Sequence, residues 1–322
     1  MTRDVAQQLG EFANRVSKSA RHWNKWARRR GIGCYRLYDR DLPAFPLVLD
    51  WYSGQVHLQE FATGWVQTEE EHGQWLEAVC ATTAHALAID PDCIHAKLRR
   101  RQQHRAAGGQ YDREGGGEAF QVEEGGLRFL VNLDAYLDSG LFLDHRLTRT
   151  RIRELAVDRR FLNLFGYTGS FSVYAAAGGA RSSLTVDLSN TYVQWAKDNL
   201  KVNGFGPPEH QVLRADVFVW LREAEAAGMR FDLAVLDPPS FSHSKKMAGV
   251  LDVQRDHVWL IRQTLRLLSP GGLLLFSTNL RDFVLDAGIA THKGCREITD
   301  ETVPEDFARH RPHRAWLIET RS

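Results

Sequence analysis

The chain has few cysteines and no long apolar run. Its 322 residues include four cysteines, and no two of them are spaced as Cys-x-x-Cys. This scatter excludes a zinc framework or a disulfide scaffold and predicts reduced thiols in a cytoplasmic protein. No run approaches the roughly 18 apolar residues that span a bilayer, and the polar N-terminus lacks the core of a signal peptide. The cysteines are Cys34, Cys80, Cys93 and Cys295.

Net charge is also small, at +1, but its distribution is uneven. Residues 1–40 hold ten Lys or Arg against three acids, and 97–105 hold five with no acid. Such clusters bind phosphate backbones without sequence preference, although a solvated surface is the ordinary alternative. The candidate RNA contacts are Arg28, Arg29, Arg30, Lys97, Arg99, Arg100, Arg101, Lys245, Lys246 and Arg255.

The length favours two domains. An apolar stripe with helical spacing predicts a basic helix over residues 1–33, in which the tryptophans either stack on RNA or dock the helix. A small α+β accessory and RNA-binding domain is predicted over 34–140, with strands in Tyr35–Phe61, a helix over Glu69–Ala88 and strands around Phe120–Val131. Between that helix and the strands around Phe120–Val131, the segment Ala106–Gly117 is predicted to be a mobile glycine-rich loop. Residues 141–322 form the third region.

That third region begins with a strand, a glycine turn and a helix. The apolar run Arg160–Phe165 precedes the turn 166–169, and a small-residue helix follows over Phe171–Ala177. Glycines let the backbone approach a ligand, and the amino end of the helix offers free N–H donors. The spacing Gly-x-x-Gly differs from the dinucleotide fingerprint, which disfavours a dehydrogenase.

Acids end the next three predicted strands: Asp187 follows Ser183–Val186, Asp216 closes the third and Asp237 the fourth. Each of the first two has an alternative role as a helix cap. Three carboxylates at successive strand ends are harder to explain as caps, and they predict S-adenosylmethionine across the edge of a doubly wound sheet. Asp187 would accept both ribose hydroxyls, and Asp216 the adenine amino group. A helix over Asp252–Leu268, stopped by the segment 269–272, and a fifth strand over Leu273–Phe276 complete the pattern.

The tetrapeptide Asp237-Pro238-Pro239-Ser240 is the strongest single signal. Two prolines stop both helix and ladder, so the chain leaves the sheet in a stiff turn at its carboxyl edge. A planar base can lie against the prolines with the carboxylate in reach, as in motif IV of base-modifying methyltransferases. The alternative is a proline-rich turn without function.

Several segments resemble the class I methyltransferases of bacterial 23S ribosomal RNA, in particular RlmK, the guanine-N7 half of bifunctional RlmK/RlmL. They are YLDSGLFLDHR, NLFGYTGSFSVYAAAGGA, TVDLSNTYVQWAKDNLKVNG, LDPPSFSHSKKM, DVQRDH and FSTN. The resemblance implies a seven-stranded Rossmann-like α/β methyltransferase domain over 141–322, preceded by the small α+β domain. It implies S-adenosylmethionine as cofactor and N7 of a guanosine in 23S RNA as target. The fused THUMP and guanine-N2 half is absent, so a separate protein of that kind is a candidate partner.

The resemblance also assigns residues. Asp144 and Arg146 would close over the methionine end of the cofactor, with Arg146 pairing its carboxylate; a salt bridge between these two residues is the alternative. The remaining predicted cofactor contacts are Asn163, Phe165, Gly166, Tyr167, Thr168, Gly169, Asp187, Leu188, Ser189, Asp216, Val217 and Asp237. The predicted catalytic residues are Asp237, Pro238, Phe241 and Asn279.

The chemistry separates the candidate targets. Cytosine-C5 methylation needs a cysteine nucleophile, and the segment 276–279, Phe-Ser-Thr-Asn, has none. Guanine N7 has a free lone pair and no proton to lose, so Asp237 would hold the base or balance the cationic product. Methylation of an exocyclic amine, on guanine N2 or adenine N6, stays open, as does a non-catalytic RNA-binding factor. His257 is predicted to be packed, not a base.

Overall fold

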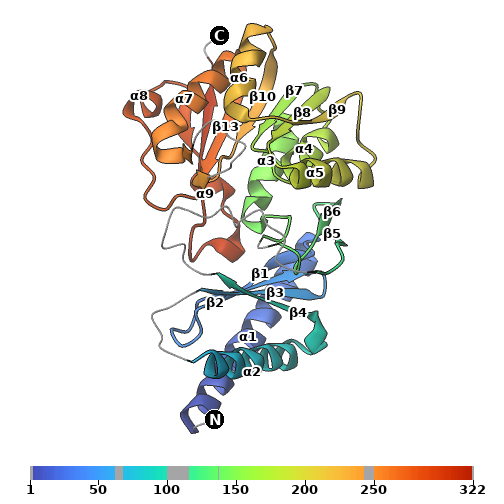
Figure 1. Cartoon of the computed structure of the whole chain (residues 1–322), viewed down its shortest axis with the longest axis vertical. Coiled ribbons are helices and arrows are strands. Elements are labelled where there is room, and N and C mark those ends of the chain that lie inside the picture. The colour runs from blue at the N-terminus through green and yellow to red at the C-terminus, as the bar shows by residue number, and fades with distance from the viewer. Residues whose placement is uncertain (1–2, 62–67, 100–115, 137, 243–249, 321–322) are drawn as a thin grey trace. The chain divides into compact units, whose positions relative to one another are not determined.

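The computed structural model describes residues 3–61, 68–99, 116–136, 138–242 and 250–320. The chain divides into two compact units. The N-terminal unit comprises 1–105, 113–126 and 131–139, and the C-terminal unit comprises 106–112, 127–130 and 140–322. In the described part of the chain, no helix is long and apolar enough to cross a membrane. Figure 1 shows both units with their elements.

The first helix, α1 (Arg3–Arg30), belongs to the core of the N-terminal unit. Its buried apolar side chains are spaced by three, four or seven residues, which places them on one face: Leu9, Phe12, Val16, Ala20 and Ala27. This face packs on the neighbouring sheet, so the residues predicted as a separate helical region share one hydrophobic core with those that follow.

The sheet of the N-terminal unit has the order β1-β2-β3-β4. The first three strands are antiparallel, and β4 runs parallel to β3. A helix, α2 (Glu69–Leu87), makes the crossover that parallel pairing requires, and a capping box between Thr68 and Glu71 starts it. The strands are β1 (Cys34–Asp39), β2 (Leu47–Tyr52), β3 (Gln55–Phe61) and β4 (Ile94–Arg99), and a short 3-10 helix, η1 (Pro91–Cys93), precedes β4. A further two-stranded sheet pairs β5 (Phe120–Glu124) with β6 (Leu127–Val131).

The C-terminal unit contains a seven-stranded sheet of order β14-β15-β13-β10-β7-β8-β9. Strands β9, β8, β7, β10 and β13 are parallel, and β15 runs antiparallel to both β13 and β14. The predicted Rossmann-like α/β class is confirmed. The strands are β7 (Arg160–Leu164), β8 (Ser182–Asp187), β9 (His210–Arg214), β10 (Phe231–Leu236), β13 (Leu268–Thr278), β14 (Cys295–Glu297) and β15 (Arg314–Glu319).

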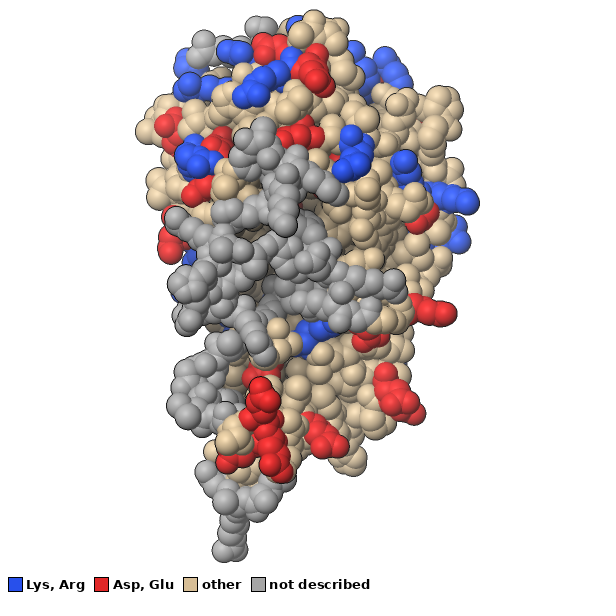
Figure 2. Space-filling model, viewed as in Figure 1, with Lys and Arg blue, Asp and Glu red and all other residues tan. Residues whose placement is uncertain are grey.

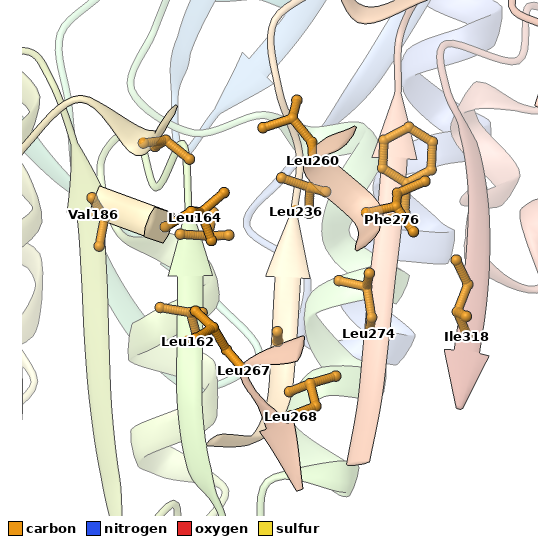
Figure 3. Packing of buried hydrophobic residues seen from close by; sticks show 14 of the residues in the cluster. Leu162, Leu164, Val186, Leu236, Leu260, Leu267, Leu268, Leu274, Phe276 and Ile318 are labelled. Carbon is orange, nitrogen blue, oxygen red and sulfur yellow. The ribbon is translucent and has the colours of Figure 1, made fainter. Parts of the chain in front are cut away.

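Helices cover both faces of this sheet, and so the central strands are apolar on both sides. Side chains from α6 and α7 pack on one face with Leu162, Leu164 and Leu236, as Figure 3 shows for several of them. Side chains from α3 and α4 pack on the other face with Phe161 and Val235. The helices are α3 (Arg146–Leu155), α4 (Ser170–Ala177), α5 (Asn190–Val202), α6 (Val217–Ala226), α7 (Val253–Arg266), α8 (Ala287–Ala290) and α9 (Thr299–Thr302).

The remaining short elements lie in the connections between the longer ones. They are the 3-10 helices η3 (Leu143–His145) and η4 (Glu305–Phe307) and the two-stranded sheet of β11 (Phe241–Ser242) and β12 (Leu251–Asp252).

One predicted boundary is corrected at the start of β13. The sequence predicts a terminator at 269–272 and a strand from Leu273, but β13 begins at Leu268. Leu268 pairs with Phe231, and the register shifts before Leu273 pairs with Leu233. The segment Ser269-Pro270-Gly271-Gly272 therefore forms an irregular stretch inside the strand. Helix α7 ends at Arg266, two residues before the start of β13.

Candidate functional site

The strand order reverses at the centre of the C-terminal sheet. From β7 the chain continues to β8 and β9 on one side, then returns to β10 and β13 on the other. Ligands of open α/β sheets bind outside the carboxyl ends of the strands at such a reversal. Asp187 ends β8, Asp216 lies two residues beyond β9, and Asp237 directly follows β10. The three predicted acids thus share one edge.

The turn after β7 has an unusual backbone. Phe165 and Tyr167 have φ values of 55° and 49°, and Gly169 has a φ of 74°. Non-glycine residues with positive φ cluster at functional sites because the surrounding structure must hold them there. A Cβ at Gly166 would lie 2.2 Å from Thr185 Cγ2, so the turn can pass over β8 only with glycine at this position.

The turn is fastened to the preceding segment at Gly140. The Gly140 amide donates to the Tyr167 hydroxyl at 3.0 Å, and the Thr168 hydroxyl donates to the Gly140 carbonyl at 2.6 Å. Thr168 is fully buried, and the Asn199 amide donates to its carbonyl. Asn163 lies buried beneath the turn, where its Nδ2 donates to Ser172 Oγ at 3.1 Å. Thr168 and Asn163 therefore support the shape of the turn.

Asp187 faces this turn from the end of β8. Its Oδ2 accepts from the Tyr167 amide at 3.0 Å, and its Oδ1 accepts from the Ser189 amide at 2.8 Å. Burial raises the pKa of Asp187 to about 6, although these amides and that of Leu188 act in the opposite direction. A desolvated carboxylate beside a strained glycine turn suits paired hydroxyl donors such as those of a ribose.

Helix capping is also present at this edge. Ser189 is the N-cap of α5, and its hydroxyl accepts from the Tyr192 amide. Asp216 is the N-cap of α6, where its Oδ1 accepts from the Phe218 amide at 2.8 Å. Val217 lies in the hydrophobic core. A carboxylate has two oxygens and about four acceptor sites, so capping by Asp216 is compatible with the predicted contact to an adenine amine.

Arg146 and Asp144 each bond a partner that is far away in the sequence. The Arg146 guanidinium donates to both carboxylate oxygens of Asp306, with each nitrogen–oxygen distance 3.0 Å. Asp144 accepts from His313 Nδ1 at 3.0 Å. A contact of Arg146 with the cofactor and the alternative salt bridge with Asp144 both stay predictions.

Two histidines lie between Asp144 and Asp237. The rings of His145 and His313 stack with centroids 4.2 Å apart and planes at 14°. His145 Nε2 lies 3.6 Å from Asp237 Oδ2 and 3.8 Å from Asp144 Oδ2. Burial, followed by the neighbouring His313, lowers the pKa of His145. The imidazole is thus kept neutral near pH 7.

Asp144, His145 and His313 bring three ligand atoms within 4.8 Å of one another. The lone pair of a ring nitrogen lies in the plane of its ring, and these two planes are nearly parallel. Lone pairs in parallel planes do not converge on one ion, so the geometry favours a stacked pair of rings over a metal centre.

Two hydrogen bonds join the chain after β10 to the end of β13. Ser277 Oγ donates to Asp237 Oδ1 at 2.7 Å, and Ser240 Oγ donates to Asn279 Oδ1 at 2.6 Å. Pro238 is buried, whereas the Phe241 side chain is 41% exposed at the same edge. A carboxylate, an amide and an exposed aromatic ring thus belong to the two segments that leave neighbouring strand ends.

His257 is packed, as predicted. It is 3% exposed, its Nδ1 lies 2.9 Å from the Gln254 carbonyl, and its Nε2 accepts from the Asp286 amide at 3.0 Å. Arg255 is exposed, with its guanidinium on Asp256.

The basic candidates of the N-terminal unit differ from one another. Arg28, Arg29 and Arg30 are all exposed, and Arg30 also lies over the Trp26 ring, 5.1 Å from its centroid. Trp26 packs against the core, as docking requires. The Lys97 ammonium donates to the Asp134 carbonyl. The side chain of Arg99 and the whole of Arg100, Arg101, Lys245 and Lys246 lie outside the described residues, as does most of the predicted loop Ala106–Gly117.

Sequence reasoning missed His145, His313, Ser277 and Gly140. His145 lies within the Leu-Asp-His-Arg segment, which is one of the segments that resemble the family, so the sequence could have indicated it. His313 is 169 residues from Asp144, and no local pattern marks it.

Comparisons agree with this geometry. A family model described as S-adenosylmethionine-dependent methyltransferase matches residues 40–300. "Ribosomal RNA large subunit methyltransferase K" of Neisseria meningitidis is 50% identical over 312 residues, covering 97% of this chain and 87% of that protein. "Ribosomal RNA large subunit methyltransferase K/L" of Allochromatium vinosum is 48% identical over 96% of this chain but 42% of its own length. The chain therefore spans less than half of that longer relative.

A methyltransferase structure complexed with SAH, SMU.776, superposes with a TM-score of 0.76 at 25% identity, covering 97% of this chain and 82% of that one. Sequence and fold therefore place the chain in the S-adenosylmethionine-dependent methyltransferase family, together with ribosomal RNA large subunit methyltransferase K.

Proposed function

We propose that the chain methylates N7 of a guanosine in 23S ribosomal RNA. The names of its relatives support a large-subunit RNA substrate. The assignment of N7 as the methylated atom rests on the residues around Asp237. The main observation is that the Asp237 carboxylate is held between Ser277 and a neutral His145.

The cofactor fits the residues at the sheet edge. Asp187 would hold the ribose, Asp216 the adenine amine, and the turn 165–169 would approach the remainder through its backbone. When bound, S-adenosylmethionine supplies an activated methyl group on a sulfonium. Desolvation and alignment of the acceptor are then the tasks left to the protein.

Asp237 suits an acceptor that gains positive charge. Methylated guanine N7 is cationic, and a fixed carboxylate stabilises charge that develops beside it. Ser277 holds one oxygen of Asp237, while the second faces His145. Because the lowered pKa keeps His145 neutral, no imidazolium neutralises Asp237 before the base arrives.

Asn279 suits the same edge of guanine. Ser240 donates to its Oδ1, which leaves the Nδ2 hydrogens to donate to a base. Beside N7, guanine presents the acceptor O6, whereas adenine presents an amino donor. An amide donor next to Asp237 therefore favours guanine over adenine.

Cysteine positions disfavour the C5 alternative. Cys34, Cys80 and Cys93 lie in the N-terminal unit. Cys295 is on the edge strand β14, which β15 and β13 separate from β10, and burial raises the pKa of its thiol. A raised pKa reduces the thiolate that C5 chemistry needs.

The test is transfer from labelled S-adenosylmethionine to unmodified 23S RNA, followed by mass spectrometry of the nucleosides. We expect 7-methylguanosine, lost in Asp237→Ala and retained in the control Cys295→Ser. An N2- or N6-methylated product would overturn the N7 assignment, and 5-methylcytosine lost in Cys295→Ser would establish C5 chemistry. Cofactor binding without transfer to RNA or to a precursor particle would favour a non-catalytic factor.

A further inference from the structure

Helix α1 carries cations along the face opposite its buried side. Lys18, Arg21, Lys25 and Arg29 are all exposed, and their spacing of three, four and four residues places them in one row. The buried residues Phe12, Val16, Ala20 and Ala27 occupy the opposite side. We call these four cations the basic stripe. At 1.5 Å per residue it extends for about 16 Å along the helix.

Among the residues that the structure describes, no carboxylate pairs with the basic stripe. Residues 12–30 contain no acid, so none of the usual pairs between oppositely charged residues four apart can form there. No described ion pair joins a stripe side chain to a carboxylate; the α1 pair that does occur, Arg15 with Asp41, lies off the row. Lys18 with Arg21, Arg21 with Lys25, and Lys25 with Arg29 are instead like-charged neighbours, which destabilise a helix.

Helix stability does not explain this arrangement. Cations favour a helix only near its C-terminus, where they meet the negative end of the dipole, and α1 ends at Arg30. That effect accounts for Arg28, Arg29 and Arg30 but not for Lys18 or Arg21. A row of repelling cations in the middle of a helix is relieved by an external anion with several regularly spaced charges.

We propose that the basic stripe binds the phosphate backbone of the RNA substrate, an inference that rests on the proposed function. Phosphates repeat along an RNA strand, and a row with one cation per helical turn can meet several of them. Trp23 and Trp26 pack against the hydrophobic core, so the contact is one of charge, without base stacking. It positions RNA without reading sequence, which leaves the choice of nucleotide to the site at Asp237.

The neighbouring helix limits where RNA can lie on this unit. α2 begins with Glu69, Glu70 and Glu71 and holds Glu77, without a lysine or arginine, and Figure 2 shows acidic side chains gathered over this part of the face in view. These carboxylates repel phosphates, so the RNA is directed to the row on α1.

The experiment compares two variants that lose equal charge. Arg21→Gln/Lys25→Gln/Arg29→Gln removes three stripe cations. Lys197→Gln/Lys201→Gln/Arg230→Gln removes three exposed cations of the C-terminal unit. Filter binding of an unmodified 23S RNA transcript is measured from about 50 to about 200 mM salt, without cofactor, and the melting temperature of each variant is recorded.

Each lost phosphate contact reduces the salt slope of log affinity by about 0.7 to 0.9. We therefore expect the stripe variant to lose about two to three from this slope, with weaker binding at low salt and an equal or higher melting temperature, since repulsion within α1 is removed. The control should keep most of its slope. Equal losses in both variants, or an unchanged slope in the stripe variant, would overturn the proposal.

The binding measurement needs no methyl transfer. A stripe variant with reduced slope, in a protein that methylates another atom, would reject the N7 assignment and retain the basic stripe. A stripe variant with an unchanged salt slope, in a protein that forms 7-methylguanosine, would reject the basic stripe and retain the N7 assignment.

Discussion

His145 Nε2 faces Asp237 Oδ2 across 3.6 Å while its ring stacks on His313. This distance is too long for a hydrogen bond, and the groups around the imidazole oppose one another. Burial, His313 and Arg149 lower the pKa of His145, whereas Asp237 and Asp144 raise it, and the net shift is downward from 6.5.

The first prediction concerns pH. Because the folded-state pKa of His145 lies below 6.5, the unfolded chain takes up a proton here before the folded chain does. This site should therefore lower stability as pH falls from 6.5 toward the folded-state pKa, and add no cost above 6.5. Thermal unfolding of the wild type and His145→Asn over this range measures the difference. The exposed His310→Asn is the control, and identical pH profiles for both variants would contradict the prediction.

The second prediction concerns Asp187 and the cofactor. Its pKa of about 6 means that the carboxylate becomes protonated as pH falls through that value and then accepts hydroxyl donors less well. Calorimetry should show S-adenosylmethionine affinity falling below about pH 6. Asp187→Asn should weaken binding about tenfold or more, as loss of a hydrogen bond to a charged group does, and should remove this pH dependence.

Without cofactor, the free energy of unfolding should depend on pH in the opposite direction from the cofactor affinity. The folded chain binds this proton more tightly than the unfolded chain, so apo stability should fall as pH rises from 3.8 to about 6. The exposed Asp282→Asn serves as the control for both measurements. A wild-type affinity independent of pH between 5 and 7 would refute the role of Asp187.

The third prediction concerns the turn. In Gly166→Ala the new methyl group would meet Thr185 Cγ2 at 2.2 Å, so we expect loss of both stability and cofactor binding. Thr185→Ser removes that methyl group but keeps the hydroxyl that lies 2.6 Å from Ser172 Oγ. The double variant should therefore be more stable than Gly166→Ala alone, although Asn163 Nδ2, at 3.2 Å, still crowds the site.

Chemical denaturation of the wild type, the two single variants and the double variant measures this coupling. Additive losses would show that Thr185 is not the obstructing group.

The fourth prediction concerns Arg146 and Asp306. Their side chains are 6% and 0% exposed, so Asp306→Ala would leave a buried guanidinium without its carboxylate and should cost about 3–5 kcal/mol of unfolding free energy. The surface pair of Arg311 with Asp300 provides the matched control. Asp300→Ala should cost at most about 1 kcal/mol. Equal costs in urea denaturation would contradict this prediction.

Local patterns predicted the elements that hold the cofactor edge. Glycines at 166 and 169, and acids after three apolar runs, place the turn and Asp187, Asp216 and Asp237 at strand ends because parallel strands end at one edge. The seven-stranded Rossmann-like sheet was implied by the family resemblance, and its strand order came from the structure, since no local signal fixes which strands pair.

Pairings over long sequence distances could not be predicted. Arg146 binds Asp306, 160 residues away. A sequence shows which charges exist, but the fold decides which of them approach, and burial then decides which pairings are stable. The same limit hid the stacking of His313 on His145.

Gly140 has a consequence for motion. Its φ is 98°, and a Cβ there would lie 2.3 Å from Trp195, so the backbone can occupy this place only as glycine. Its amide and carbonyl bond the side chains of Tyr167 and Thr168. Opening of the turn must break both bonds together, which makes the two segments one cooperative unit. Hydrogen exchange at the Gly140 amide thus reports how often the turn opens.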